Sequence, residues 1–148
     1  MKKKVVNLKF AGSRKDYVKV LKTIEKTKKC PFCKENFKYH KKSILKKEKG
    51  WFITKSTWPY KNTQYHFLII PEKHKENFSQ LSFFDFKIVS KLINWAIKKY
   101  KIKGGGFLLR FGESIYTGST VCHLHFHLIV PQINKKNKTA KTVYFPIA

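Results

Sequence analysis

Arginine is nearly absent from this strongly basic chain of 148 residues. Only Arg14 and Arg110 are arginine among 33 basic residues, and acidic residues number 8, so the formal net charge is +25. Base-specific contacts and bidentate phosphate clamps in nucleic-acid-binding proteins favour arginine, whereas lysine acts as a compact point charge. Lysines scattered along the whole chain therefore indicate a solvated surface that attracts polyanions, and they do not favour dedicated nucleic-acid binding.

Long apolar runs are absent as well. No window approaches the roughly 18 consecutive apolar residues of a membrane span, and the lysine-rich start of the chain contains no secretory signal. We therefore expect a cytoplasmic protein without a membrane-spanning segment. Cysteine is scarce too: of three in total, two are spaced as Cys30 and Cys33. Three cysteines favour a metal or redox pair over a disulfide framework.

What remains is the composition of one globular domain. Hydrophobic residues make up 42% and aromatic residues 16% of the chain, which suffices for one core at this length. We expect a single domain over residues 1–148, with an N-terminal arm at 1–12 and a basic C-terminal tail at 134–148. The apolar residues 143–147 are expected either to dock back on the domain or to contact a partner subunit.

Apolar periodicity predicts two main helices and several antiparallel strands. Capping-box patterns start the helices at Ser13 and Ser82, and apolar residues continue at helical spacing to about Lys28 and Tyr100. Runs rich in aromatic and β-branched residues predict strands at 51–54, 65–70, 107–111 and 123–130. Helices and antiparallel strands in this order give the fold class α+β.

The last of these strands carries three of the chain's six histidines: His123, His125 and His127. Because successive side chains of a strand point to opposite faces, the three histidines share one face and the intervening apolar residues share the core face. Neutral imidazole is a competent nucleophile near pH 7 and attacks phosphorus readily. We interpret the central His125 as the nucleophile, with His127 donating to a nonbridging oxygen or to the leaving group.

The loop before this strand predicts a phosphate-binding site. Gly118, Ser119 and Thr120 can place backbone N–H groups and two hydroxyl groups beside the same phosphate, in the manner of an oxyanion hole. Trp58 and Tyr60, in the turn after residue 54, can stack on one nucleobase as easily as on a strand of bases. Cys122 is expected to be a buried thiol that points away from the histidine face.

Residues 118–129, Gly-Ser-Thr-Val-Cys-His-Leu-His-Phe-His-Leu-Ile, resemble the signature of the histidine triad (HIT) superfamily. Residues 67–74, Phe-Leu-Ile-Ile-Pro-Glu-Lys-His, are similar to its strand ending in Ile-Pro-Lys-x-His. The resemblance covers roughly residues 30–131 and implies a HIT-like fold, with an antiparallel sheet of about five strands that often dimerises. It further implies nucleotide hydrolases or transferases that attack an α-phosphate through the middle histidine and form a covalent nucleotidyl-histidine.

The chain departs from the pattern of this family in its phosphate loop. Many hydrolytic members carry glutamine where Ser119 stands, and their loop is shorter than residues 112–118. In transferase branches the third histidine is typically glutamine, so the intact His127 favours hydrolysis. Arg110 lies near a position where many members have asparagine, and it is either a ribose or phosphate contact or an ordinary salt bridge at the strand end.

Cys30 and Cys33 supply half of a tetrahedral zinc site. A redox pair would normally lie in a thioredoxin-like βαβ context, which the pattern lacks. Zinc-bearing members of the family that this chain resembles add the histidine after Ile-Pro and the first triad histidine. The resemblance therefore implies a structural zinc site of Cys30, Cys33, His74 and His123. His40 is a rival ligand in a setting that indicates exposure, and His66 is expected to have a core or surface role.

Three functions follow from this pattern. We expect a nucleotide phosphohydrolase acting on dinucleoside polyphosphates or adenylylated small molecules, in a homodimer. The second function is aprataxin-like removal of adenylyl groups from nucleic-acid ends, which the charge permits, although no C-terminal zinc finger follows the triad. The third is a nucleotide-binding protein without turnover, against which the intact triad argues.

Overall fold

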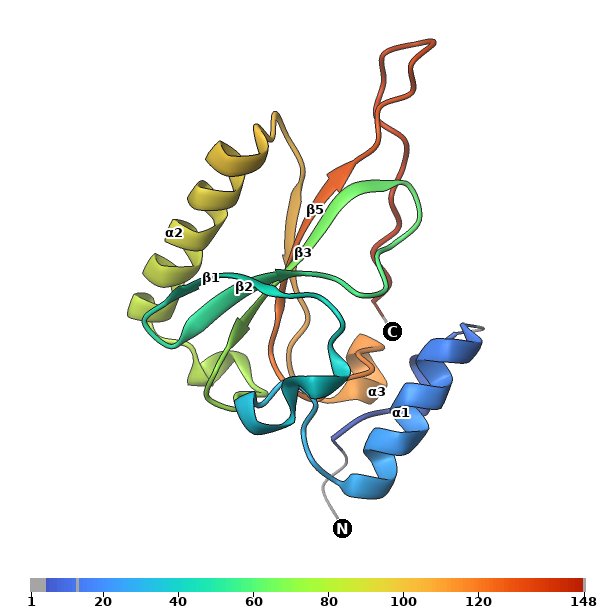
Figure 1. Ribbon diagram of the computed structural model, residues 1–148, viewed down its shortest axis with the longest axis vertical. Coiled ribbons are helices and arrows are strands. Elements are labelled where there is room, and N and C mark those ends of the chain that lie inside the picture. Colours follow the sequence, from blue (N-terminus) through green and yellow to red (C-terminus); the bar gives the residue numbers. More distant parts are fainter. Residues whose placement is uncertain (1–4, 13, 148) are drawn as a thin grey trace.

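Five antiparallel strands form one sheet in the order β1-β2-β3-β5-β4 (Figure 1). This computed structural model describes residues 5–12 and 14–147. The strands are β1 Ile44–Glu48, β2 Trp51–Lys55, β3 Thr63–Pro71, β4 Gly106–Leu109 and β5 Phe126–Pro131. The predicted class α+β and the sheet of about five strands are confirmed.

Strand β1 was not predicted, because only Ile44 and Leu45 of its five residues are apolar. It pairs with β2 across a two-residue turn in which Lys49 and Gly50 both have positive φ, at 40° and 80°. Two central residues with positive φ suit a tight hairpin, because they match the twist of the flanking strands. The lysine-glycine pair was therefore the signal available in the sequence.

The histidine strand is shorter than predicted. Strand β5 begins at Phe126, so His123, Leu124 and His125 precede it. Pairing with β4 ends there because β4 finishes at Leu109, opposite Phe126, and pairing with β3 ends at Ile69, although β3 itself continues to Pro71. The N–H of Leu124 donates instead to the carbonyl of Lys75 in the loop after β3, at 2.7 Å.

The two faces of the sheet have different covers. Helix α2, Phe83–Tyr100, packs its buried stripe of Ile88, Val89, Leu92 and Ala96 against the apolar face that includes Phe126 and Leu128. Its predicted capping box is present between Ser82 and Asp85. Figure 1 shows α2 along one side of the sheet, with α1 and the single-turn helix α3, Ser114–Thr117, on the other.

Helix α1, Lys15–Thr27, lies over the face of the sheet that carries the triad histidines. Arg14 occupies its N-cap position and the left-handed Lys28 ends it; the predicted N-cap, Ser13, lies outside the described residues. Leu21 and Ile24 of α1 pack with residues that precede the helix and with Val121 of the loop before the triad. The helix is thereby fixed beside the histidines.

The C-terminal tail returns to the triad. Residues 132–141 form a hairpin beyond β5, closed by an Ile133–Ala140 bridge, and the chain then runs back toward α1 (Figure 1). Phe145 contacts the ring of His127, with centroids 5.0 Å apart. Of the two outcomes predicted for residues 143–147, docking on the domain is the one that the structure shows. Among the described residues no helix is long and apolar enough to cross a membrane.

Candidate functional site

The three triad histidines gather on the sheet face that α2 leaves uncovered. Their side chains are buried, and the rings of His125 and His127 lie 4.8 Å apart. Phe32 contacts the rings of His123 and His125 with centroid distances of 6.1 and 5.1 Å. The predicted common face for the three histidines is therefore present, even though the regular strand begins only at Phe126.

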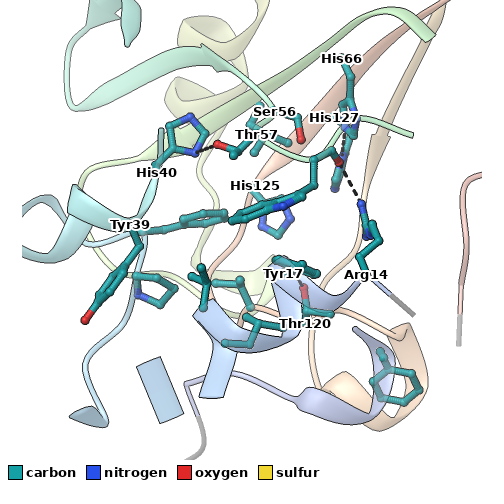
Figure 2. A pocket seen from close by; sticks show the side chains of 18 of the residues that line it. Arg14, Tyr17, Tyr39, His40, Ser56, Thr57, His66, Thr120, His125 and His127 are labelled. Atoms are coloured by element: carbon teal, nitrogen blue, oxygen red, sulfur yellow. Dashed lines mark hydrogen bonds between the residues drawn. The ribbon is translucent and has the colours of Figure 1, made fainter. Parts of the chain in front are cut away.

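A cavity of about 280 Å³ opens onto two of these histidines, His125 and His127 (Figure 2). Its walls come from α1, from the loop between β2 and β3, and from the loop before the triad. Aromatic side chains dominate the lining: Phe10, Tyr17, Phe32, Tyr39, Trp58 and Tyr60. A space of this size and lining suits one nucleotide, with apolar and aromatic surfaces for the base and a few convergent polar groups for the phosphate.

The tautomer of His125 can be assigned from its one hydrogen bond. Its Nδ1 lies 2.7 Å from the carbonyl oxygen of His123. A carbonyl oxygen only accepts, so Nδ1 carries the proton and Nε2 retains its lone pair. Burial is the largest cause that lowers the pKa of His125, to about 3, so the ring is neutral near pH 7. This is the state that a nucleophilic imidazole requires.

His66, on β3, fixes the proton of His127. The backbone N–H of Tyr60 donates to Nδ1 of His66 at 3.2 Å, so the proton of His66 is on Nε2. That Nε2 lies 2.9 Å from Nδ1 of His127 and donates to it. The proton of His127 is then on Nε2, a buried atom without a hydrogen-bond partner among the described residues. Nε2–H of His127 is therefore a donor available to a ligand.

The electrostatic environment keeps this histidine pair neutral. Burial, followed by the charges of Arg110 and Arg14, lowers the pKa of His66 to about 4. Burial also places the pKa of His127 well below its ordinary value, with further lowering from His125, His66 and Arg110. His66, predicted to have only a core or surface role, is thus a site residue. A single histidine in a strand belongs to no sequence motif, so the sequence held no signal for this role. The contact of His66 with His127 follows from strand pairing, in which His66 lies opposite Ile129 of β5.

The far end of the cavity has a half-buried histidine, His40. His40 is not exposed as expected: its Nε2 lies 2.9 Å from Oγ1 of Thr54, and Oγ1 of Thr57 lies 3.3 Å from its Nδ1. The Thr54 hydroxyl donates to the carbonyl of Ser43 at 2.8 Å, so it accepts from Nε2–H of His40. Burial lowers the pKa of His40 to about 4. A neutral polar group therefore closes this end of the cavity.

The predicted phosphate loop reaches the cavity only in part. Gly118, in the left-handed conformation at the end of α3, lines it, and so does Thr120, whose hydroxyl is hydrogen-bonded to Tyr17. Ser119 does not line the cavity, and its hydroxyl donates to the carbonyl of Val121 at 3.0 Å. Its local bond explains the difference, because a serine in a turn often bonds to the nearby backbone.

Arg110 lines the cavity as well. Its guanidinium donates to the Tyr60 hydroxyl at 3.1 Å and to the carbonyl of Pro146 at 3.2 Å, and its Nε is buried without a hydrogen-bond partner among the described residues. These contacts place its charge beside the triad. Of the two roles considered for Arg110, a contact with substrate has this position in its favour.

The four predicted zinc ligands converge next to the triad. The ligand atoms of Cys30, Cys33, His74 and His123 all lie within 4.8 Å of one another. Sγ of Cys30 lies 3.2 Å from Nδ1 of His123, and Sγ of Cys33 lies 3.4 Å from Nδ1 of His74. Zinc bonds of about 2.3 Å to sulfur and 2.1 Å to nitrogen, at the tetrahedral angle, separate the two atoms by about 3.6 Å.

Both histidines of this cluster present a lone pair to the thiols. Nε2 of His123 lies 2.9 Å from the carbonyl of Pro71, and Nε2 of His74 lies 2.7 Å from a carboxylate oxygen of Glu76. Each oxygen accepts the Nε2 proton, which leaves Nδ1 unprotonated, as in proteins whose zinc-bound histidines donate their other nitrogen to an oxygen. The cluster fits a metal ion of the zinc class. His40 lies outside it, and Cys122 is half-buried and outside it as well.

Comparison with known families identifies the chain. The family described as "Scavenger mRNA decapping enzyme C-term binding" matches residues 29–142, well over half of the sequence. The chain belongs to this family. Helix α1 and the last residues of the tail lie outside the matched segment. Comparison with curated proteins finds no match.

Solved histidine triad proteins share the fold. A histidine triad nucleotide-binding protein from Candida albicans is 21% identical over 81% of this chain and 85% of its own, with a TM-score of 0.60. A histidine triad protein from Clostridium difficile is 23% identical, covering 73% and 94%, with a TM-score of 0.52. A HIT family hydrolase from Legionella pneumophila is 21% identical, covering 73% and 98%, with a TM-score of 0.51. The predicted membership of the histidine triad superfamily and the HIT-like fold are confirmed.

Proposed function

We propose that this protein is a nucleotide phosphohydrolase that cleaves at the α-phosphate through His125. The observation that carries the proposal is the pair of fixed tautomers: Nε2 of His125 has a lone pair, and Nε2–H of His127, a residue that lines the same cavity, has no partner among the described residues. A nucleophile and a preorganised donor side by side are what phosphoryl transfer needs. A protein that only binds nucleotides has no need of a nucleophile.

The reaction proceeds in two displacements. Nε2 of His125 attacks the α-phosphate, the leaving group departs with the electron pair of its bond to phosphorus, and a nucleotidyl-histidine forms. The positive charge that develops on the imidazole is stabilised by the carbonyl of His123, which accepts from Nδ1 at 2.7 Å. Water then attacks phosphorus, the electron pair of the P–N bond returns to His125, and the nucleoside monophosphate is released.

The substrates proposed are dinucleoside polyphosphates or adenylylated small molecules. The cavity of about 280 Å³ is bounded by α1 and by Pro146 of the tail, which suits one mononucleotide better than a polymer. Cys30, Cys33, His74 and His123 would hold a zinc ion, which would fix the turn after α1 to the start of the triad. Because four protein ligands complete a tetrahedron, the metal would be structural.

The sheet edge suits a homodimer, which we also propose. Strand β4 is the last strand of the sheet, and Phe107 on it is 45% exposed. An unpaired edge with an exposed aromatic side chain favours pairing with a second strand. Sedimentation velocity measures the assembly, and a monomer at micromolar concentration contradicts it.

The experiment that tests the function is product analysis with three substrates: diadenosine tetraphosphate, an adenosine phosphoramidate and adenylylated DNA. Wild-type protein should release AMP from at least one of the two small molecules. His125→Ala should lower kcat by more than about 10⁴-fold, as removal of a nucleophile does, while nucleotide binding is retained. Preferred cleavage of adenylylated DNA favours the nucleic-acid alternative, and binding without turnover of any substrate favours a nucleotide-binding protein.

A further inference from the structure

The proposed function uses a donor that is covered in the structure. Nε2 of His127 is buried and has no hydrogen-bond partner among the described residues. A substrate oxygen has to come within roughly 3 Å to accept from this N–H. The backbone of His127 is paired with strands on both sides, and its ring is held by His66 at 2.9 Å. A covering group therefore has to move before the Nε2–H of His127 can reach a substrate.

Among the described residues, two aromatic rings cover His127 besides those of the neighbouring histidines. They are Tyr60 and Phe145, at 5.9 and 5.0 Å between ring centroids. Tyr60 is fixed at both ends, because its backbone N–H donates to His66 and its hydroxyl accepts from Arg110. Phe145 belongs to the C-terminal tail and meets His127 and Tyr60 edge to face. Of the two side chains, that of Phe145 is the one that can leave without breaking a hydrogen bond.

The tail segment that carries Phe145, residues 143–147, is held by few contacts, and we call it the strap. It forms neither helix nor strand, and of its side chains only those of Val143 and Phe145 are half-buried. The guanidinium of Arg110 donates to the carbonyl of Pro146 at 3.2 Å and lies 5.0 Å from the ring centre of Phe145. A segment with few buried apolar contacts opens at a small fraction of the free energy of global unfolding. The strap is therefore suited to opening while the sheet stays folded.

The strap borders two cavities. Pro146 lines the cavity that opens onto the triad, whereas Val143 and Phe145 line a groove of about 870 Å³. Apolar side chains of β4 and β5, Leu108 and Ile129, form part of the wall of this groove. The groove is large enough to take a phenylalanine ring. Phe145 therefore has an apolar place to occupy when it leaves His127, so its removal from the triad does not require exposure of the ring to water.

We propose that the strap is a gate, closed on the triad in this structure, that opens when substrate binds as Phe145 turns from His127 into the groove. This inference rests on the proposed function, because a substrate has to displace Phe145 only if it bonds to Nε2 of His127. The closed state competes with substrate. The apparent dissociation constant of the substrate is therefore the intrinsic one divided by the fraction of molecules in which the strap is open.

Phe145→Ala weakens the closed state and tests the gate. The loss of one aromatic contact changes an equilibrium by about 2–10-fold. KM for diadenosine tetraphosphate should therefore fall by about this factor, with kcat nearly unchanged. Adding Phe145→Ala to His125→Ala should lower Kd for the same compound equally. Hydrogen exchange followed by NMR tests the gate without any substrate: the Nε2–H of His127 should exchange with water faster in Phe145→Ala than in the wild type.

Two further variants give the controls. Tyr144→Ala changes the next residue of the strap, whose side chain is 83% exposed, and should alter neither KM nor the exchange rate. Phe145→Leu keeps an apolar side chain and should lie between the wild type and Phe145→Ala.

Two outcomes contradict the gate and leave the proposed function standing. The first is a higher KM or a lower kcat in Phe145→Ala, which makes the strap a fixed wall of the site. The second is exchange of the His127 proton at the same rate in Phe145→Ala and the wild type. If the wild type neither binds nor cleaves any of the nucleotide substrates, the proposed function fails, and so does a gate that opens for them.

Discussion

A single buried histidine outside the triad determines which nitrogen of His127 carries the proton. His66 accepts a hydrogen bond from the backbone N–H of Tyr60 and donates one from its own Nε2–H to His127. Without that chain of hydrogen bonds, the neutral ring of His127 would distribute its proton between two nitrogens. The His66 side chain lines the cavity, but its proposed effect acts through His127, so we describe it as a positioning residue.

Replacement of His66 should therefore reduce turnover more than binding. His66→Phe removes the donor to Nδ1 of His127, and we expect kcat to fall by about 10²-fold with little change in KM, because one preorganised donor is lost from the transition state. His66→Gln retains an amide N–H that can reach Nδ1 and should recover part of kcat. Steady-state kinetics with the preferred substrate measures both, and imidazole nitrogen NMR reports the tautomer of His127.

The matched control is Tyr65→Phe, one residue earlier on β3, whose side chain contacts Phe67 and Tyr100 on the opposite face of the sheet. It should leave kcat unchanged. A positioning role for His66 is refuted if His66→Phe and His66→Gln reduce kcat equally while the tautomer of His127 is unaltered.

At this scale the sequence predicted residues that carry a motif and missed those that do not. The triad and the cysteine pair have characteristic spacing, so their grouping was predictable. His66 and His40 have no such spacing, and their places in the cavity come from packing against β5 and the β2–β3 loop. The hydroxyl of Ser119 was expected on phosphate, but its bond to Val121 depends on the local turn, which spacing does not define.

Three separate segments meet at the proposed zinc site: the turn after α1, the loop after β3, and the residues just before β5. Metal binding to a site that is absent from the unfolded chain adds directly to folding stability. Cys30→Ser should lower the thermal midpoint by more than about 5 °C, since 1 kcal/mol shifts it by roughly 2–4 °C at this size. The chemistry should change less at temperatures where the variant stays folded.

Elemental analysis of untreated protein should find one zinc ion per chain. Cys122→Ser is the matched control, because Cys122 also lies near the triad but outside the cluster. It should retain zinc and lose less stability than Cys30→Ser. Untreated protein that contains no metal contradicts the zinc assignment, and so does equal loss of stability in the two variants.

The start of α2 could be predicted from the sequence, because a local motif, the capping box at Ser82, sets it and is formed as predicted. The ends of strands could not be predicted in this way, because pairing with other strands sets them. The triad strand starts at Phe126, where its pairing with Ile69 and Leu109 ends, and the alternation of histidine and apolar residues is the same on both sides of that boundary. Strand β1 depends on the Lys49–Gly50 turn more than on its own apolar content.

Over the whole molecule, the walls of the cavity come partly from segments that the family match does not include. Arg14 and Tyr17 precede residue 29, while Pro146 follows residue 142. Family resemblance predicted the grouping of the triad histidines and of the cysteine–histidine cluster, which lie inside the match. It could not predict what faces them across the cavity, because the contacts of α1 and of the tail with the triad are long-range packing with no sequence motif.

The final prediction concerns the 33 basic residues and the field that they produce. With both arginines in the cavity and no lysine of the described chain lining it, the lysines can attract a polyanion without binding it specifically. Raising the salt concentration from 0.05 to 0.5 M should therefore raise KM for adenosine 5′-tetraphosphate by roughly tenfold, with kcat nearly constant, because screening slows the encounter. The phosphoramidate carries much less charge, so its KM should change far less, which separates steering from a general effect of salt on the protein.

Binding of single-stranded and duplex DNA to His125→Ala should weaken steeply over the same salt series. For duplex DNA, log K should fall by roughly 0.9 for each phosphate neutralised and each log unit of salt concentration. Sub-micromolar DNA affinity that persists at physiological salt, with adenylylated ends preferred, would show that the lysines hold a nucleic-acid substrate instead.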